Sequence, residues 1–310
     1  MSRLRIATRG SQLALAQSGL VARRIAESLG VETELVEIRT TGDRIQDVSL
    51  AKIGGKGLFI KEIEEALLED RADLAIHSAK DLPAAIAPGL VLAAIPERAD
   101  PRDALIGAGA SSSLEGLPGG ARVGTGSVRR GSQLRAMRPD LEIVPLRGNV
   151  DTRLRKLEEQ DLDAVILACA GLDRLGLDGR IHERVSPDLL LPAVGQGTLA
   201  IEVRDGDPVA RELEVVDHPG TRAELTAERA FLSQLQGDCS VPLAALAERA
   251  SPDRVALRGL VASPDGRRVV RASAEANLAD AALAGRRVAD EVLRKGAASV
   301  LEAIRIEASG

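Results

Sequence analysis

The stretch Arg71-Ala-Asp-Leu-Ala-Ile-His-Ser-Ala-Lys-Asp-Leu-Pro83 decides the fold, because it predicts a buried strand that opens into a loop. The apolar run 74–76 is short and follows a charged helical segment, which is typical of such a strand. Ligands in open α/β sheets bind beyond the carboxyl ends of the strands. At this end stand Lys80 and Asp81, and Pro83 prevents regular structure from continuing. A carboxylate placed there can exchange a proton and stabilise a cation, whereas an ordinary surface ion pair is the alternative.

Length and composition favour a soluble protein of two or three domains. The chain has 310 residues, of which 45% are hydrophobic and 28% charged. It has only two Cys, no apolar signal-peptide core after MSRLRIATRG and no run long enough for a membrane span, so we expect a cytoplasmic protein without a membrane partner. The net charge is −5, with no Trp, no Tyr and two Phe, which argues against nucleic acid as a partner. The three His have no metal-ligand spacing, so no metal is expected.

The amino-terminal part predicts an anion site at the start of a helix. A strand is expected over residues 3–8, and an amphipathic helix runs from about 12 to 29. Ser11 can cap this helix, so Arg9 and the first-turn amides face the same point beyond the strand. Further strands are expected over 32–39 and 90–95, with a helix over 58–70. The glycine-rich stretch 40–57, which contains Lys52 and Lys56, is a candidate lid or a merely flexible loop.

The middle of the chain repeats one pattern: a strand, a Gly or Ser turn, Arg, and then a helix. It occurs at Arg9, at Ser127 with Arg129 and Arg130, and at Arg147, which is followed by a helix from about residue 151 that carries Arg153. Arginine forks match the geometry of carboxylates, although solvated surface Arg is the alternative for any one of them. The third glycine of a dinucleotide-binding loop is missing and no P-loop occurs, so nucleotide binding is disfavoured.

A second α/β unit and a smaller final unit complete the chain. An apolar strand over 163–168 precedes Cys169, which is predicted to be a small buried residue, and Arg174 follows. We interpret residues 96–101 as a hinge and 190–202 as a return to the first lobe, which gives two lobes around a cleft. The segment after residue 219 predicts helices at about 224–235 and 280–295 with strands between them. The thiol of its loop residue Cys239 either acts as a nucleophile or has no functional role.

Seven motifs in one order resemble those of the porphobilinogen deaminase family, also called hydroxymethylbilane synthases. The resemblance extends from Leu4 to about Leu243. The motifs are RIATRGSQLALAQ, GGKGLFIKEIE, HSAKDLP, GTGSVRRGSQL, LRGNVDTRL, LPAVGQG and LQGDCSVPL.

The resemblance implies a transferase that joins four porphobilinogen molecules head to tail with loss of ammonia. The chain would grow on a dipyrromethane cofactor, held by a thioether to Cys239, and hydroxymethylbilane would be released by hydrolysis. Asp81 matches the catalytic carboxylate, which would stabilise an electron-poor methylenepyrrolenine cation and the pyrrole N–H groups. Each ring carries acetate and propionate groups, and the Arg residues would bind these carboxylates.

The resemblance also assigns roles to further residues. The cofactor-binding set is Cys239, Lys80, Asp81, Ser127, Arg129, Arg130 and Gly148. The substrate-binding set is Arg9, Ser11, Phe59, Arg147, Arg153, Arg174 and Gln196, with Lys52 and Lys56 in the lid. Two positions depart from the family pattern: Gly126 stands where Ser is frequent, and Asp238 stands where Gly is frequent.

Pattern and resemblance together predict an α/β fold with two lobes like those of periplasmic binding proteins, with mixed, mainly parallel sheets, and a small C-terminal α+β domain. Residues 1–97 and 198–215 would form lobe 1, 102–192 lobe 2, and 219–310 the domain with the Cys239 loop. We expect a monomer. The rival from another class is a non-catalytic bilobal protein that binds small anions, and a third possibility is a degenerate enzyme that loads its cofactor without turnover.

Overall fold

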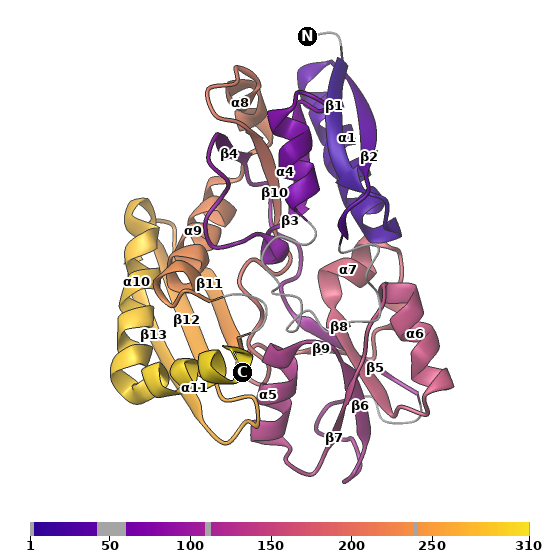
Figure 1. Ribbon diagram of the computed structural model, residues 1–310, viewed down its shortest axis with the longest axis vertical. Helices are drawn as coiled ribbons and strands as arrows, with labels where there is room; N and C mark the ends of the chain where they lie inside the picture. Colours follow the sequence, from indigo (N-terminus) through magenta and orange to yellow (C-terminus); the bar gives the residue numbers. More distant parts are fainter. Residues whose placement is uncertain (1–2, 42–59, 109–112, 238–240, 310) are drawn as a thin grey trace.

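The strands of the protein form three separate sheets in a computed structural model (Figure 1). The structure describes residues 3–41, 60–108, 113–237 and 241–309. Two sheets have five strands each and the third has three. In Figure 1 the first sheet lies above the second, and the third lies beside them with its two long helices.

The first sheet has the order β2-β1-β3-β10-β4. β1 is parallel to β2 and to β3, whereas β10 is antiparallel to β3 and to β4. Alternate residues of β1 and β3 pack against helices on opposite faces, one face against α1 and the other against α4. The elements are β1 (Arg3–Arg9), α1 (Gln12–Leu29), β2 (Glu32–Ile38), α4 (Lys61–Leu68), β3 (Leu74–Ser78), β4 (Leu90–Ala94) and β10 (Leu199–Arg204).

The second sheet repeats this design with the order β7-β6-β8-β5-β9. β6 is parallel to β7 and β8, and β5 is antiparallel to β8 and β9. In both sheets a single strand therefore runs against the other four. The elements are β5 (Asp103–Gly107), β6 (Arg122–Thr125), α5 (Val128–Met137), β7 (Glu142–Pro145), α6 (Val150–Glu159), β8 (Ala164–Ala168), α7 (Cys169–Arg174) and β9 (Glu183–Val185).

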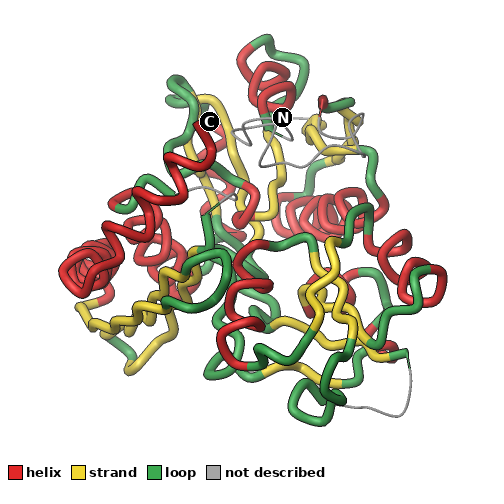
Figure 2. Tube along the Cα trace, turned by 60° about the horizontal axis from the view of Figure 1, so that its bottom comes forward, coloured by secondary structure: helices red, strands yellow, loops and turns green. Residues whose placement is uncertain are grey.

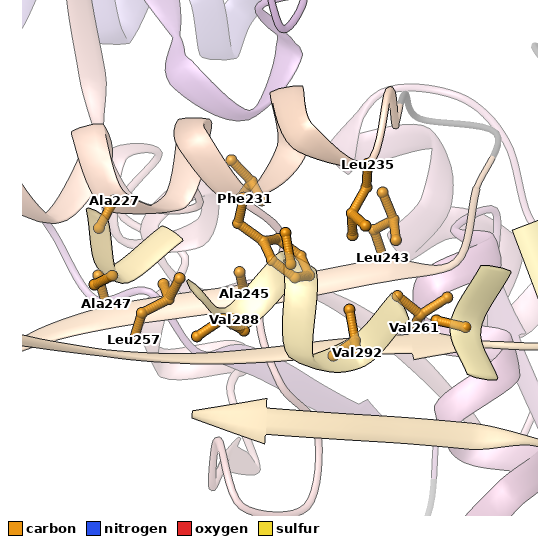
Figure 3. Close-up of a cluster of buried hydrophobic side chains, with 14 of the residues drawn as sticks. Ala227, Phe231, Leu235, Leu243, Ala245, Ala247, Leu257, Val261, Val288 and Val292 are labelled. Carbon is orange, nitrogen blue, oxygen red and sulfur yellow. The ribbon is translucent and has the colours of Figure 1, made fainter. Parts of the chain in front are cut away.

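The third unit packs two helices against an antiparallel sheet of order β11-β12-β13. Phe231 of α9 is fully buried between that helix, the sheet and α10, as Figure 3 shows. Figure 2 gives a second view of the helices and strands of all three units. The elements of this unit are α9 (Pro219–Gln234), β11 (Leu243–Ser251), β12 (Arg254–Ala262), β13 (Val269–Asn277), α10 (Ala281–Val292) and α11 (Ala298–Ser309), whereas α8 (Val209–Glu212) packs against the first sheet.

One buried carboxylate joins the third unit to both connections between the larger sheets. These connections are residues 95–102 and 186–198. Glu228 on α9 accepts hydrogen bonds from Arg98 Nη1 at 2.7 Å, from the Gly195 backbone N–H at 2.6 Å and from the Ala247 backbone N–H at 2.8 Å. Loss of Glu228 would leave the buried Arg98 guanidinium without its carboxylate. Glu228 therefore stabilises the packing of the third unit against both connections.

The predicted fold class, an α/β protein with two lobes of mixed, mainly parallel sheets and a small α+β unit, is confirmed by these strand orders. Several predicted elements differ in extent. Helix α9 begins five residues earlier than expected because the His218 ring accepts the Thr221 backbone N–H at 3.1 Å and caps it. The last predicted helix ends at Val292, because the chain turns at Gly296, where φ is +100°, before α11. Strands β5 and β9 were not predicted.

The close contact between α9 and α10 predicts that Gly→Ala, which normally stabilises a helix, destabilises the protein at Gly285. A Cβ on Gly285 would overlap the carbonyl oxygen of Ala227. We expect Gly285→Ala to lower the free energy of unfolding by about 1–3 kcal/mol, because the helices must separate. Gly19→Ala in α1 is the matched control, since only the Arg23 side chain lies within 4 Å. It should stabilise by about 0.5–1 kcal/mol in urea unfolding. Equal midpoints for both variants would contradict the packing argument.

Candidate active site

Asp81 lies where β3 ends, on a short turn formed by Ala79–Asp81. Because β1 pairs with β3, Arg9 at the end of β1 reaches the same edge of the sheet. Ser11 caps α1, accepting the Ala14 backbone N–H at 3.3 Å, as predicted. Arg9, Ser11 and Asp81 line one cavity of about 60 Å³, which Gln17, His77 and Ser78 also line.

Lys80, the neighbour of Asp81, faces charges that come from the second sheet. Burial lowers the pKa of Lys80, the nearby charges of Arg130 and Arg153 lower it further, and those of Asp81 and Asp103 oppose the shift. The return connection packs on the same turn, because a Cβ on Gly195 would lie 2.9 Å from the Lys80 backbone nitrogen. Both larger sheets therefore contribute to a single site.

Arg129 and Arg130, predicted to bind ligand carboxylates, both face a carboxylate of the protein itself. Asp103 is fully buried and accepts from Arg129 Nη1 at 2.8 Å and from Arg130 Nη2 at 2.7 Å. Burial alone would raise the pKa of Asp103, but the two guanidinium groups hold it well below its ordinary value. Gln196 is part of this network: its amide donates to Asp103 at 2.9 Å and accepts from Arg129 at 3.3 Å.

Arg153 and Arg174 are also predicted arginines, and both are desolvated. Burial lowers the pKa of Arg153 to about 10, and the charges of Arg130 and Arg147 contribute to the shift. Burial likewise lowers the pKa of Arg174, at the end of α7, to about 10, and its Nη2 donates to the Gly197 carbonyl at 2.7 Å. The Nε atoms of Arg129, Arg153 and Arg174 are buried and have no hydrogen-bond partner in the structure. Buried donors of this kind are costly unless a ligand accepts from them.

Two glycines set the backbone around these side chains. Gly148 has φ of +115°, and a Cβ there would lie 2.7 Å from Thr152 Cβ. At Gly126, where the family frequently has Ser, a Cβ would overlap the carbonyl oxygen of Leu146. The end of β6 thus approaches the residue before Arg147 so closely that this backbone admits only glycine. Ser127 occupies the predicted cap of α5, accepting the Arg130 backbone N–H at 3.4 Å.

Eight of the predicted residues fall into three groups in the structure. Arg9, Ser11 and Asp81 line the cavity. Lys80 and Arg153 interact electrostatically with Asp81. Arg129, Arg130 and Gln196 bind Asp103. Five of the predicted or discussed residues lie outside the described ranges: Lys52, Lys56, Phe59, Asp238 and Cys239.

Sequence reasoning missed Asp103, and it considered His77 only as a possible metal ligand. The signal for Asp103 is a carboxylate directly before the apolar run 104–106, where a buried charge needs a partner. Cys169 is fully buried as predicted, and burial raises the pKa of its thiol to about 12.

Two general searches of the described residues complete the description. No helix of the described ranges is long and apolar enough to cross a membrane. Among those same residues, no three His, Cys, Asp or Glu side chains are grouped as metal ligands.

The structure is that of a two-lobed α/β protein in which cations from both lobes lie near the carboxylate of Asp81, and such an arrangement suits an anionic ligand. The model of the family "Porphobilinogen deaminase, dipyromethane cofactor binding domain" matches residues 4–212, and the model "Porphobilinogen deaminase, C-terminal domain" matches residues 223–294. The chain belongs to the porphobilinogen deaminase family and contains that family's dipyrromethane cofactor-binding domain.

Curated relatives match almost the whole chain. The porphobilinogen deaminase of Nitratidesulfovibrio vulgaris (strain DP4) is 51% identical over 98% of this chain and 97% of its own. That of Roseiflexus sp. (strain RS-1) is 50% identical over 96% and 97%. Among solved structures, a TRAP periplasmic solute binding protein from Desulfovibrio salexigens aligns with a TM-score of 0.41 and 10% identity, over 70% of this chain and 71% of that one.

The buried pairing at Asp103 generates a prediction about stability. Asp103→Asn keeps the shape but leaves two buried guanidinium groups without their carboxylate, so the free energy of unfolding should fall by about 3–5 kcal/mol at pH 7. Urea unfolding measures this change. Asp140→Asn, which breaks an exposed pair with Arg138, is the matched control and should leave the urea midpoint nearly unchanged.

The pH dependence of this difference has a definite sign. Because the folded-state pKa of Asp103 is depressed, its stabilisation is complete above the unfolded value of about 3.9 and is lost as pH falls through the lower folded value. The wild type and Asp103→Asn should therefore converge only in strong acid. Convergence at pH 5 to 6, or a cost at pH 7 equal to that of Asp140→Asn, would remove Asp103 from this role.

Proposed function

We propose that the chain is a transferase that condenses four porphobilinogen molecules head to tail, with release of ammonia, to give hydroxymethylbilane for tetrapyrrole and heme biosynthesis. The observation that carries the proposal is Asp81 at the strand end, next to buried cations from both lobes, in a chain of the porphobilinogen deaminase family. Family membership favours this enzyme over a non-catalytic anion-binding protein.

The residues of the site suit a ligand that carries carboxylates. The buried Nε atoms of Arg129, Arg153 and Arg174 have no partner among the described residues, and Lys80 is desolvated, so donors remain for a carboxylate. We propose that Lys80, Ser127, Arg129, Arg130 and Gly148 hold the dipyrromethane group, which is attached by a thioether to Cys239. When bound, this group supplies the free pyrrole carbon at which the product chain is extended.

We propose Asp81 as the catalytic residue. Its carboxylate can exchange a proton with the aminomethyl nitrogen of the substrate, which assists the departure of ammonia, and can stabilise the positive charge that develops. Lys80 and the arginines stabilise the acetate and propionate groups electrostatically. The substrate-binding residues in this proposal are Arg9, Ser11, Phe59, Arg147, Arg153, Arg174 and Gln196.

The remaining proposals concern organisation. We propose lobe 1 as residues 1–97 with 198–215, lobe 2 as 102–192, and a C-terminal domain over 219–310; each sheet of the structure falls within one of these divisions, which supports them. A lid with Lys52 and Lys56 would cover the cleft. We further propose a cytoplasmic monomer whose only partner is its small-molecule substrate.

Covalent attachment at Cys239 gives the first test of the proposed function. Intact-mass measurement of the recombinant chain should show the polypeptide plus two pyrrole rings, and Ehrlich's reagent should colour the protein. Cys239→Ser should remove both signals. Cys169→Ser is the matched control, because that thiol is buried, and should keep the added mass. A bare polypeptide made in a host that synthesises tetrapyrroles would instead support the anion-binding protein.

Asp81→Asn tests the catalytic assignment. The variant should fold and keep the added mass, but kcat for porphobilinogen consumption should fall by about 10²–10⁴-fold, because the amide cannot exchange the proton or balance the cation. Ammonia release measures turnover and also identifies a degenerate enzyme. Asp253→Asn, in the exposed turn between β11 and β12, should leave kcat unchanged. Normal turnover in Asp81→Asn would exclude the assignment.

A further inference from the structure

A buried histidine and glutamate lie beside the catalytic turn and have no part in the function proposed so far. His77 Nε2 on β3 is 2.9 Å from Glu202 Oε2 on β10. The side chains are 4% and 0% exposed. Burying two ionisable groups costs free energy that packing with apolar residues would not, so the pair needs an explanation beyond joining two strands.

The charges around the pair leave room for one more proton. Glu64 of α4 and Arg229 of α9 are close enough to interact electrostatically with Glu202, and Glu64 also interacts with His77. Burial and the charge of Glu202 raise the pKa of Glu64. With His77 neutral, two carboxylates and one guanidinium give this cluster a net charge of −1. A buried net negative charge is stabilised by an added positive charge.

His77 also reaches the cavity that contains Asp81. Its Nε2 is held by Glu202, and the structure gives Nδ1 no protein partner in the described part of the chain, while the ring lines the cavity of about 60 Å³ with Arg9 and Asp81. The cavity has both polar and apolar lining residues and is large enough for a water molecule. A proton can therefore pass between Asp81 and Nδ1 through water, while Glu202 fixes the tautomer.

The proposed reaction needs a place for such a proton. In each condensation the C–N bond of the aminomethyl group breaks and a C–C bond forms at the free α-carbon of the preceding ring. That α-carbon then loses one proton, and the aminomethyl nitrogen must gain one proton to leave as ammonia, so each condensation is proton-neutral. Asp81 cannot hold the proton from the α-carbon and remain the anion that stabilises the next cation.

We propose that His77, held by Glu202, is a positioning residue that takes the α-carbon proton from Asp81 after each condensation and returns it to Asp81 for transfer to the aminomethyl nitrogen of the next substrate. This inference rests on the proposed function. It assigns the net −1 cluster of Glu64, His77, Glu202 and Arg229 as the proton acceptor behind the catalytic carboxylate.

The test uses His77→Gln in the cofactor-loaded enzyme, because glutamine can still donate to Glu202 but takes up no proton. We expect kcat to fall by about tenfold or more with KM nearly unchanged, and the acid limb of the kcat profile against pH to be displaced. Glu202→Gln should act in the same direction. The double variant should be no slower than the slower single variant, since both changes remove one device. His182→Gln is the matched control, because that ring only accepts the Gly107 backbone N–H.

Several outcomes overturn the inference. A normal pH profile in a folded, active His77→Gln variant would reduce the pair to a structural contact, even if its melting temperature fell. Strictly additive losses in the double variant would count against a shared device. An inactive wild type would remove the proposed function and this inference with it, whereas an active wild type with an unaffected variant removes this inference alone.

A measurement independent of activity and of variant folding is also possible. The chain has three His, so nitrogen-15 labelling of histidine gives few signals, and variants at His182 and His218 identify the third. At neutral pH in the absence of substrate, His77 should carry its proton on Nε2 and none on Nδ1. A proton fixed on Nδ1, or full protonation throughout the active pH range, would contradict the proposal.

Discussion

The buried carboxylate of Asp103 is the constraint on which the site depends. It lies at the start of β5, the strand that runs against its neighbours in the second sheet, and it receives both guanidinium groups from the first turn of α5. Cations at the start of a helix oppose the helix dipole, so this arrangement is costly without a buried anion. Asp103 supplies that anion and leaves the partnerless Nε of Arg129 for a ligand.

The repeated strand order explains why two lobes make one site. In each larger sheet the parallel strands place their carboxyl ends at one edge, and the connections 95–102 and 186–198 bring these edges together. Glu228 holds both connections through Arg98 and the Gly195 backbone. Because Glu228 belongs to helix α9, the third unit contacts both connections that position the site.

Local chemistry made much of this arrangement predictable. The strand over 74–76, the Ser11 cap and the Ser127 cap each follow from a few adjacent residues, and all occur in the structure. The pairings that organise the site join residues far apart in the chain, such as Asp103 with Arg129 and His77 with Glu202, and no local pattern encodes them. Strand β9 has three residues and follows no apolar run, so its existence depends on pairing with β5.

The same limit explains why the predicted arginines proved unequal. From the sequence, Arg129, Arg130, Arg153 and Arg174 each follow a strand or begin a helix, and nothing distinguishes them. In the structure the first two share the carboxylate of Asp103, whereas burial lowers the pKa of Arg153 and of Arg174 to about 10. The difference comes from one carboxylate that tertiary structure places beside two of them.

Asp81 stands at a boundary between opposite charges. On one side lie Lys80 and Arg153, whose ammonium and guanidinium groups are desolvated and favour carboxylates. His77 and Glu202 form the second group, in a cluster that we propose takes up a proton. An anionic ligand is stabilised on the first side and a proton on the second, so binding and proton transfer need not compete for the same groups. A carboxylate surrounded only by cations would bind the ligand but would give a released proton no favourable place to go.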